Sequence, residues 1–302
     1  MDTRRLQTFV RIVEVGSLTR AADVLHVAQP ALSQQLSALE TELGQRLLIR
    51  SKRGVEPTEA GAALYRHAQL ILKQVEDAVA AVGQSGREVA GQVSLGLAPY
   101  STANLFMLPL LTAVRRRYPR ILLRITDNFG PVLSEAMMNG RLDLAILYDP
   151  GSMSGLATER LVTDDLVLVC RADAAPDLGE SVRIDSIAEL PLMLPGPSHT
   201  IRKAVMAACE AAGVAPNLVA ELESVRLMGG AVTAGLGCTI LPRTVAARLP
   251  NQSPLRTMEL APSIEVHLAL GTPSVRSLSR AAECVRGLLR EVVAASLTGT
   301  VG

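Results

Sequence analysis

The sequence predicts three successive parts: a helical N-terminal unit with a β-hairpin, one long helix, and a larger α/β remainder. Residues 17–43 hold two helical patterns joined by a tight turn, which is the order of a helix-turn-helix. Residues 46–58 join a short apolar run to a basic turn containing a glycine, which predicts a hairpin, or wing. From residue 92 onward, short apolar runs alternate with helical patterns, which predicts an α/β fold with a parallel sheet.

The composition fits a chain of two to three compact units, since 48% of its 302 residues are apolar. The formal net charge is only +1, so any binding of nucleic acid must depend on local clusters of charge. It also argues against a non-specific nucleoid protein, because such proteins depend on neutralising many phosphates. Aromatic residues make up 2% and tryptophan is absent, which argues against the base stacking that single-strand binders use.

The cysteines and the N-terminus indicate where the protein works. The cysteines are far apart and form no CxxC motif; they are Cys170, Cys209, Cys238 and Cys284. This spacing predicts buried free thiols in a reducing cytosol, with a redox-switch pair as the alternative. The first helical pattern is interrupted by Arg11 and Glu14, unlike a signal peptide. No apolar run approaches the ~20 residues of a membrane span, so we expect a cytoplasmic protein.

The helix-turn-helix begins at Ser17, which suits an N-cap because a serine hydroxyl can accept from a first-turn amide. Gln29 and Pro30 open its second helix, where the missing proline donor costs nothing. The apolar stripe of that helix leaves Gln29, Ser33 and Gln34 facing outward. Short uncharged side chains of this kind suit contact with base edges in a DNA major groove. An αα-hairpin with a polar face is the alternative that these residues leave open.

The wing adds positive charge beside that face. Arg46, Arg50, Lys52 and Arg53 fall within eight residues, and Gly54 closes the turn. A basic edge next to a polar helix predicts phosphate contacts. A charge run alone is more often a solvated face, but the combination with a helix-turn-helix is more specific.

The long helix is predicted to begin after Thr58 and to carry a coiled-coil seam. Its apolar residues recur at alternating spacings of four and three: Leu64, Ala68, Ile71, Val75, Ala78 and Val82. This repeat indicates a partner helix. A helix that lies on its own domain is the alternative reading.

The pattern of the α/β remainder predicts two lobes. Apolar runs at 93–97, 121–126 and 142–147 predict strands of the first lobe, and runs at 166–170, 192–194 and 238–242 predict strands of the second. A last strand, 266–270, and a C-terminal helix, 275–295, are expected to return to the first lobe.

Polar loops follow several of these strands, where ligands bind in open α/β sheets. The candidate site residues are Tyr100, Ser101, Thr102, Asn128, Phe129, Ser198, His199, Thr200 and Arg202. Their amides, hydroxyls and guanidinium suit a small carboxylate or similar anion. Individual Ser and Thr residues could instead be ordinary N-caps, and Phe129 could fill the cleft as a plug.

Catalytic motifs are missing from the sequence. It contains no nucleophile elbow, P-loop, HExxH motif, complete GxGxxG motif or metal-ligand cluster. We therefore expect no enzyme activity, no cofactor and no metal.

The N-terminal residues resemble the signature of LysR-type transcriptional regulators. The matching segments are Gly16-Ser17-Leu18, Ala21-Ala22, Leu25, Gln29-Pro30-Ala31-Leu32-Ser33, Leu39-Glu40, Leu43-Gly44, Leu47-Leu48, Arg50 and Pro57-Thr58-Glu59-Ala60-Gly61. Within that family, VEVGSLTRAADVLHVAQPALSQQLSALE and LLIRSKRGVEPTEAG look most like the nitrogen assimilation control branch.

The resemblance implies a winged helix-turn-helix over 1–58, a dimerising linker helix over 59–89, and a regulatory domain over 90–302 similar to periplasmic binding proteins. Lobe I would take about 90–161 and 267–302, and lobe II about 162–266. It implies a dimer or tetramer that bends promoter DNA, meets RNA polymerase, and responds to a small-molecule effector between the lobes. Its dimer contacts would be Leu64, Ala68, Ile71, Val75 and Val82. The DNA contacts would be Ser17, Thr19, Gln29, Pro30, Ser33, Gln34, Arg50, Lys52 and Arg53. Alternatives are a regulator that needs no inducer and, from another class, a cytosolic solute binder or enzyme.

Overall fold

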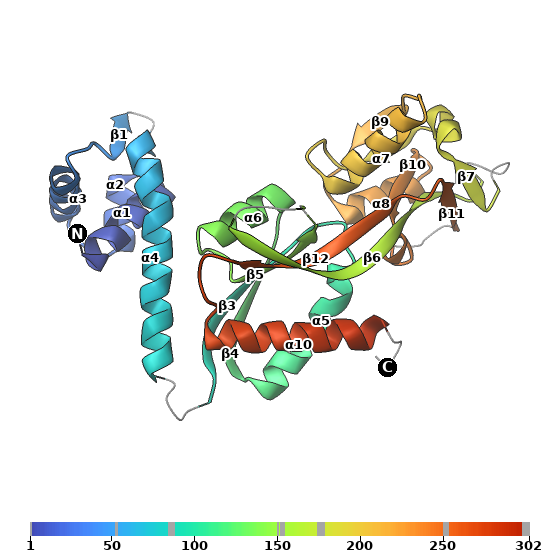
Figure 1. Ribbon diagram of the computed structural model, residues 1–302. Helices are drawn as coiled ribbons and strands as arrows, with labels where there is room; N and C mark the ends of the chain where they lie inside the picture. The colour runs from blue at the N-terminus through green and yellow to red at the C-terminus, as the bar shows by residue number, and fades with distance from the viewer. Residues whose placement is uncertain are drawn as a thin grey trace. The chain divides into compact units, whose positions relative to one another are not determined.

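A computed structural model describes residues 2–51, 54–83, 88–149, 151, 155–173, 179–249 and 254–297 (Figure 1). The chain forms two compact units. The first holds residues 1–88 with 138–141, and the second holds residues 89–137 with 142–302.

The first unit contains four helices and one hairpin among the described residues. In chain order they are α1 (Thr3–Val15), α2 (Leu18–Val24), α3 (Gln29–Leu43), β1 (Leu48–Ser51), β2 (Gly54–Pro57) and α4 (Glu59–Gly83). Phe9, Ile12, Leu32 and Leu36 lie at the centre of its core and are almost fully buried. The apolar stripe of α3 therefore faces α1, which leaves the polar side of α3 outside.

The wing is fixed against the turn between α1 and α2. β1 and β2 pair antiparallel, and the Val55 amide donates to the Gly16 carbonyl at 2.9 Å. Gly54 has φ +130°, and a Cβ added there would lie 2.6 Å from the Gly16 oxygen. Both the backbone conformation and the close approach therefore require glycine at position 54.

In the first lobe of the second unit, strands and helices form a sandwich of three layers. Its elements are β3 (Ala90–Leu97), α5 (Ala103–Arg117), β4 (Arg120–Asp127), α6 (Gly130–Met138), β5 (Leu144–Tyr148), β12 (Glu265–Pro273) and α10 (Arg280–Leu297). The strand order begins β4-β3-β5-β12. Figure 1 shows α5 and α10 on one side of this sheet and α6 on the other.

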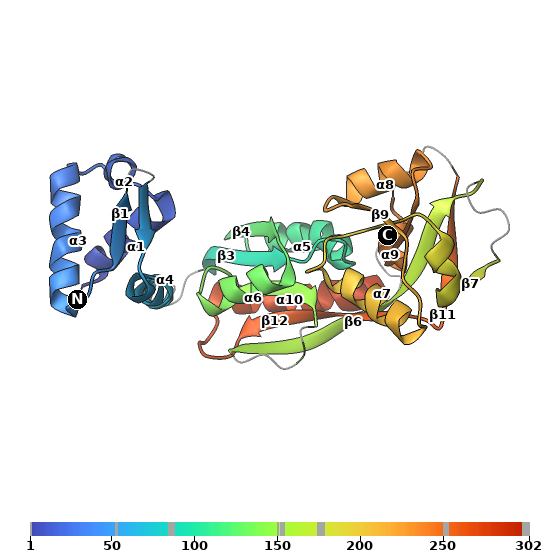
Figure 2. The same cartoon turned by 90° about the horizontal axis from the view of Figure 1, so that it is seen from above.

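The second lobe is built on the continuation of one long strand, β6 (Leu156–Arg171). Its other elements are β7 (Ser181–Arg183), η1 (Ile184–Glu189), β8 (Leu192–Leu194), α7 (Thr200–Ala211), β9 (Leu218–Glu221), α8 (Val225–Thr233), β10 (Cys238–Pro242), α9 (Arg243–Ala246) and β11 (Leu255–Ala261). Figures 1 and 2 show β6 as one ribbon that runs from the first lobe into the second.

The sheet is mixed, so the expectation of a parallel sheet is correct only in part. β3 pairs parallel with β4 and β5, as expected for strands joined through helices. β12 instead pairs antiparallel with β5 and β6, and β10 pairs antiparallel with β6. β6 runs out of the first lobe and β12 runs back into it, so these two strands pair antiparallel along their length.

The structure joins two of the cysteines, so the prediction of free thiols is wrong for this pair. Cys170 of β6 and Cys238 of β10 form a disulfide between neighbouring antiparallel strands, with a Cα–Cα distance of 4.5 Å. Cys209 and Cys284 are free. None of the helices in the described part of the chain combines the length and apolarity that crossing a bilayer requires.

Candidate functional site

The outer face of α3 carries most of the predicted base-contacting residues. Gln29, Pro30 and Gln34 are exposed, and Ser33 is half-buried beside the buried Leu32. Ala28 occupies the N-cap, and its side chain makes no capping hydrogen bond. The start of α3 thus presents uncharged side chains next to first-turn amides, which is a surface suited to DNA.

The wing lies beside this face. Arg50 of β1 is exposed, and its Nη1 donates to Ser33 Oγ at 3.3 Å. This bond brings a cation from the wing to the polar face of α3. Lys52 and Arg53, the other predicted phosphate contacts of the wing, lie outside the described residues.

The two predicted contacts at the start of α2 differ in their surroundings. Ser17 is half-buried, and its Oγ accepts from the Arg20 amide at 3.4 Å, so this hydroxyl caps the helix. Thr19 is exposed in the first turn. Capping orients Ser17 locally, and Thr19 is the more exposed of the two side chains.

The sequence placed Glu40 in a matching segment but gave no role to its side chain. Its Oε1 accepts from the Leu47 amide at 2.8 Å and from the Leu48 amide at 3.3 Å. The carboxylate therefore fixes the start of β1 to α3, which places the wing. A glutamate on a helix surface carries no sequence signal for this role, because its partners are backbone groups of the following segment.

Only part of the predicted α4 seam is open to a partner. Ala68 is fully buried against α1, where Leu64 also packs, so Ala68 cannot contact a second chain. Farther along the helix, Ile71 and Val75 are 38% and 40% exposed. Val79 and Val82, at 69% and 79%, extend the exposed apolar stripe.

In the second unit, the loop after β3 connects the two lobes. Tyr100 is fully buried with φ +52°, and its hydroxyl donates to the Leu222 carbonyl at 2.7 Å. Thr102 Oγ1 donates to Asp164 Oδ2 at 2.8 Å and lies 2.7 Å from Thr244 Oγ1. Burial raises the pKa of Tyr100, which keeps its hydroxyl protonated and able to donate.

His199 is the centre of an aromatic cluster between the lobes. The ring centroids of Tyr100, Phe129 and Tyr148 lie 5.5, 6.2 and 6.0 Å from its own, all at edge-to-face angles. Its Nδ1 accepts from the Ile201 amide at 3.2 Å as the α7 cap, so Nε2 carries the proton toward the Pro99 carbonyl at 3.3 Å. Burial lowers the pKa of His199 to about 4, so the imidazole is neutral at pH 7.

The cavity beside His199 is nearly filled. Its volume is about 10 Å³, and it is lined by Ala98, Pro99, Phe129, Gly130, Tyr148, Ser198, His199 and Thr200. A space of this size holds one water molecule at most. Four predicted site residues meet there: Phe129, Ser198, His199 and Thr200. Tyr148 also lines the cavity. The sequence did not indicate this, because Tyr148 is the last residue of a buried strand and reads as part of the core.

The other predicted site residues have different roles. Arg202 donates to the Pro195 carbonyl and to Glu221, each at 3.2 Å, so its charge is used within the second lobe. Asn128 is exposed and caps its own turn by accepting from the Phe129 amide. Ser101 is buried and donates to the Ala98 carbonyl. Since no described residue that lines the cavity is charged, the expected cation for an anionic effector is not at this cavity.

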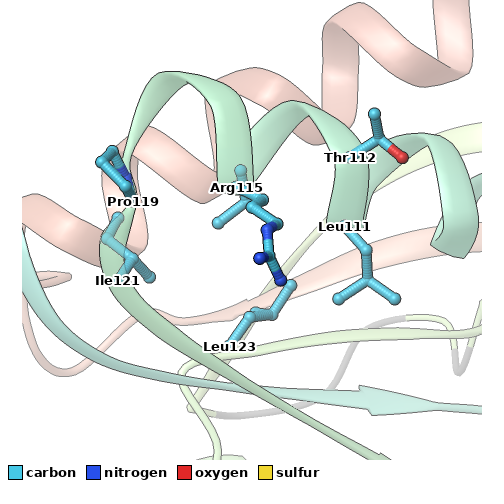
Figure 3. A pocket seen from close by; sticks show the side chains of 7 residues that line it. Leu111, Thr112, Arg115, Pro119, Ile121 and Leu123 are labelled. Atoms are coloured by element: carbon cyan, nitrogen blue, oxygen red, sulfur yellow. The ribbon is translucent and has the colours of Figure 1, made fainter.

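A shallow groove of about 710 Å³ marks a second surface of this unit, between α5 and β4. Figure 3 shows Leu111, Arg115 and Leu123 converging in it from the helix and the strand. β4 is the terminal strand of the sheet, and Leu122 on it is 62% exposed. Apolar side chains on an unpaired sheet edge favour contact with another protein surface.

A winged helix-turn-helix, a helix with an exposed apolar stripe and a two-lobed α/β unit define a class: DNA-binding proteins with an attached regulatory domain. Comparison with known families places the chain more closely. Residues 3–62 match "Bacterial regulatory helix-turn-helix protein, lysR family", and residues 86–294 match "LysR substrate binding domain". The chain therefore belongs to the LysR family of bacterial transcriptional regulators.

The relatives agree with this assignment. The chain is 41% identical to the nitrogen assimilation regulatory protein nac of Escherichia coli over 97% of its own length and 95% of the relative's. It is 40% identical to the protein of the same name in Klebsiella aerogenes, over the same fractions of both chains. The expected resemblance to this branch is confirmed.

Solved structures share the fold. A full-length OxyR variant of Pseudomonas aeruginosa superposes with a TM-score of 0.75 at 25% identity, covering 97% of this chain and 94% of that one. Full-length CbnR in complex with its target DNA gives a TM-score of 0.70 at 22% identity, covering 98% and 100%.

Proposed function

We propose that this regulator reads promoter DNA through α3 and the wing, with each copy contacting one half of an inverted repeat. The observation that carries the proposal is the exposed, uncharged face of α3 with Arg50 beside it. In this reading Gln34 contacts a base, and Gln29, Pro30 and Ser33 complete the face. Membership of a family of bacterial transcriptional regulators supports the proposal.

The contacts divide into two classes with different effects. A glutamine amide can bond bidentately to adenine, which is worth about 1–3 kcal/mol of discrimination. The basic residues of the wing neutralise phosphates and carry no sequence information. Arg50, Lys52 and Arg53 of the wing, together with the hydroxyls of Ser17 and Thr19 at the start of α2, are assigned to phosphate contacts.

A binding titration at two salt concentrations tests this division. We expect Gln34→Ala to weaken binding to the specific site more than binding to random duplex. Arg53→Ala should weaken both and reduce the salt slope by about 1. Equal losses on both DNAs for Gln34→Ala would remove the base-reading role of this residue.

Two surfaces support assembly into a homotetramer. The exposed stripe of α4 from Ile71 to Val82 fits a second copy of the same helix, because apolar side chains on a helix are stabilised by pairing. The groove between α5 and β4 supplies a second self-contact of a different kind. A DNA-bound tetramer would act in the cytoplasm, where it could meet RNA polymerase at the promoter.

We consider two modes of control for the second unit, and the size of its cavity favours one of them. In the first, a small effector opens the lobes and binds near His199. In the second, side chains of the protein itself fill the cleft, and the regulator works without an inducer. The cavity of about 10 Å³ and the bonds that tie the loop after β3 to the second lobe support the second mode.

A thermal-shift screen of the full chain against metabolites separates the two modes. A ligand that binds the folded state raises the melting temperature with its concentration above Kd. A shift that His199→Phe removes would establish the first mode. No shift across a broad panel of carboxylates, amino acids and phosphates would leave the second.

A further inference from the structure

One carboxylate holds the base of the wing. Glu40 Oε1 accepts from the amides of Leu47 and Leu48, at 2.8 and 3.3 Å. Both leucines are almost fully buried, and a buried amide that loses its acceptor is unfavourable. The position of the Glu40 oxygen therefore determines where β1 begins.

From this point β1 runs back along α3. Ser33 precedes Glu40 by seven residues, or about two helical turns, so the two side chains lie on the same side of the helix. Arg50 lies two residues after Leu48 in β1, and its Nη1 reaches Ser33 Oγ at 3.3 Å. The contact at Ser33 joins two side chains at the surface, whereas the contact at Glu40 fixes the backbone of the strand.

The second strand of the wing is attached elsewhere. The Val55 amide of β2 donates to the Gly16 carbonyl at 2.9 Å, in the turn between α1 and α2. The backbone of β2 is thus tied to that turn, and the backbone of β1 is tied to α3 through Glu40. Loss of the Glu40 bonds would leave the distance between β1 and α3 less defined.

We propose that Glu40 is a positioning residue for DNA binding: its carboxylate holds β1 along α3, so that Arg50 and the other cations of the wing meet phosphates while α3 lies in the major groove. The inference rests on the phosphate contacts given to the wing in the proposed function. Glu40 itself does not bind phosphate, because a carboxylate has only acceptors and repels the anionic DNA backbone. Its effect on affinity comes from geometry and opposes the effect of its charge.

Two conservative substitutions separate geometry from charge. Glu40→Asp keeps the charge but withdraws the carboxylate by one methylene from the two amides. Glu40→Gln removes the charge but keeps an oxygen that can accept both bonds from the same place. Glu42→Asp and Glu42→Gln are the matched controls, because Glu42 lies on the same helix and pairs with Arg5 of α1 instead of with the wing.

The readout is binding of the full-length protein to random duplex DNA at several salt concentrations, since phosphate contacts carry no sequence information. We expect Glu40→Asp to weaken binding and to lower the salt slope by about 1 for each cation of the wing that it displaces. Glu40→Gln should keep the slope of the wild type and bind at least as tightly. Neither control should change the slope. If charge alone mattered, Glu40→Gln would differ from the wild type and Glu40→Asp would not.

A double-mutant cycle tests whether the effect passes through Arg50. In the native background, Arg50→Met should lower the salt slope by about 1. In the Glu40→Asp background it should lower the slope by much less, because Arg50 has already left the phosphate. Hydrogen exchange of segment 46–51 gives a second measurement: it should be faster in Glu40→Asp than in the wild type and in Glu40→Gln.

The inference is overturned if Glu40→Asp binds random duplex with the slope of the wild type, or if Arg50→Met costs the same in both backgrounds. A Glu40→Asp variant that is largely unfolded without denaturant would overturn it too, because the side chain would then serve stability. If instead Arg50→Met leaves the slope unchanged in the native background, the phosphate role of the wing fails. That outcome is a failure of the proposed function, so the two failures are distinguishable.

Discussion

Acidification should destabilise the regulatory unit through His199. Burial lowers the pKa of this imidazole from 6.5 to about 4. Each tenfold difference in proton affinity between the folded and unfolded states is worth about 1.4 kcal/mol, so neutral His199 contributes about 3 kcal/mol above pH 6.5. Between pH 6.5 and about 4 the unfolded chain takes up a proton that the folded chain does not, so stability falls in that window.

Burial lowers the pKa of His199, and the bond from its ring to the Pro99 carbonyl acts in the opposite direction. In the folded state Nδ1 accepts from the Ile201 amide, and a proton on Nδ1 would abolish that bond. His199→Asn is the matched variant, because asparagine can also cap a helix and does not titrate. Between pH 7 and pH 5 the wild type should lose roughly 2 kcal/mol more unfolding free energy than the variant.

Urea denaturation of the full-length protein at both pH values measures this difference. Near-UV circular dichroism is a suitable probe, because tryptophan is absent and three of the four tyrosines, Tyr100, Tyr118 and Tyr148, lie in the second unit. Carboxylates titrate in both proteins, so their effects cancel in the comparison. If the gap in stability between wild type and His199→Asn is the same at pH 7 and pH 5, burial and capping do not hold His199 neutral.

Three further predictions concern assembly, the disulfide and the wing. Leu111→Glu, in the groove between α5 and β4, should reduce the largest oligomer in sedimentation velocity, whereas Leu227→Glu, on a residue 58% exposed in the second lobe, should not. The unfolded, non-reduced protein should show two reactive thiols, and reduction of the β6–β10 disulfide should lower stability by up to about 4 kcal/mol; four thiols would contradict the pairing. Gly54→Ala should cost more than about 1 kcal/mol because of its φ and the nearby carbonyl. Gly287→Ala, in a helix with open space, should stabilise by roughly 0.5–1 kcal/mol; chemical denaturation checks both.

The N-terminal unit could be predicted well because its signals are local. Ser17 caps α2, and Pro30 lies in the first turn of α3, where a proline loses no hydrogen bond. Capping and helical periodicity depend on residues within one turn of each other. The burial of Ala68 was not accessible in this way, since the heptad pattern is the same for a helix that packs on its own unit and one that packs on a partner.

The start of β6, the strand that passes from the first lobe to the second, could not be predicted from the pattern of apolar residues. The run Thr163-Asp164-Asp165 interrupts the apolar pattern, so the sequence predicted a strand start at Leu166, whereas β6 begins at Leu156. That polar run spans the junction of the lobes, where Asp164 accepts from Thr102 and Thr244. A strand that changes lobes does not keep one buried face, so alternation is lost.

The candidate site was predicted in outline but not in detail. The rule that ligand loops follow strands correctly brought Phe129 and His199 together. It could not place Arg202, because that side chain is held by Glu221, nineteen positions away on β9. The disulfide likewise depends on the register of β6 against β10, across a separation of 68 residues.

The most direct test of base reading by α3 is the ratio of two dissociation constants. They are measured for the wild-type protein at about 150 mM salt, on an inverted repeat enriched from random duplexes and on the same sequence scrambled. Specific regulators typically bind their sites at least about 10³-fold more tightly than other DNA, and we expect a ratio of that size. A ratio within about tenfold would mean that the polar face of α3 does not read sequence.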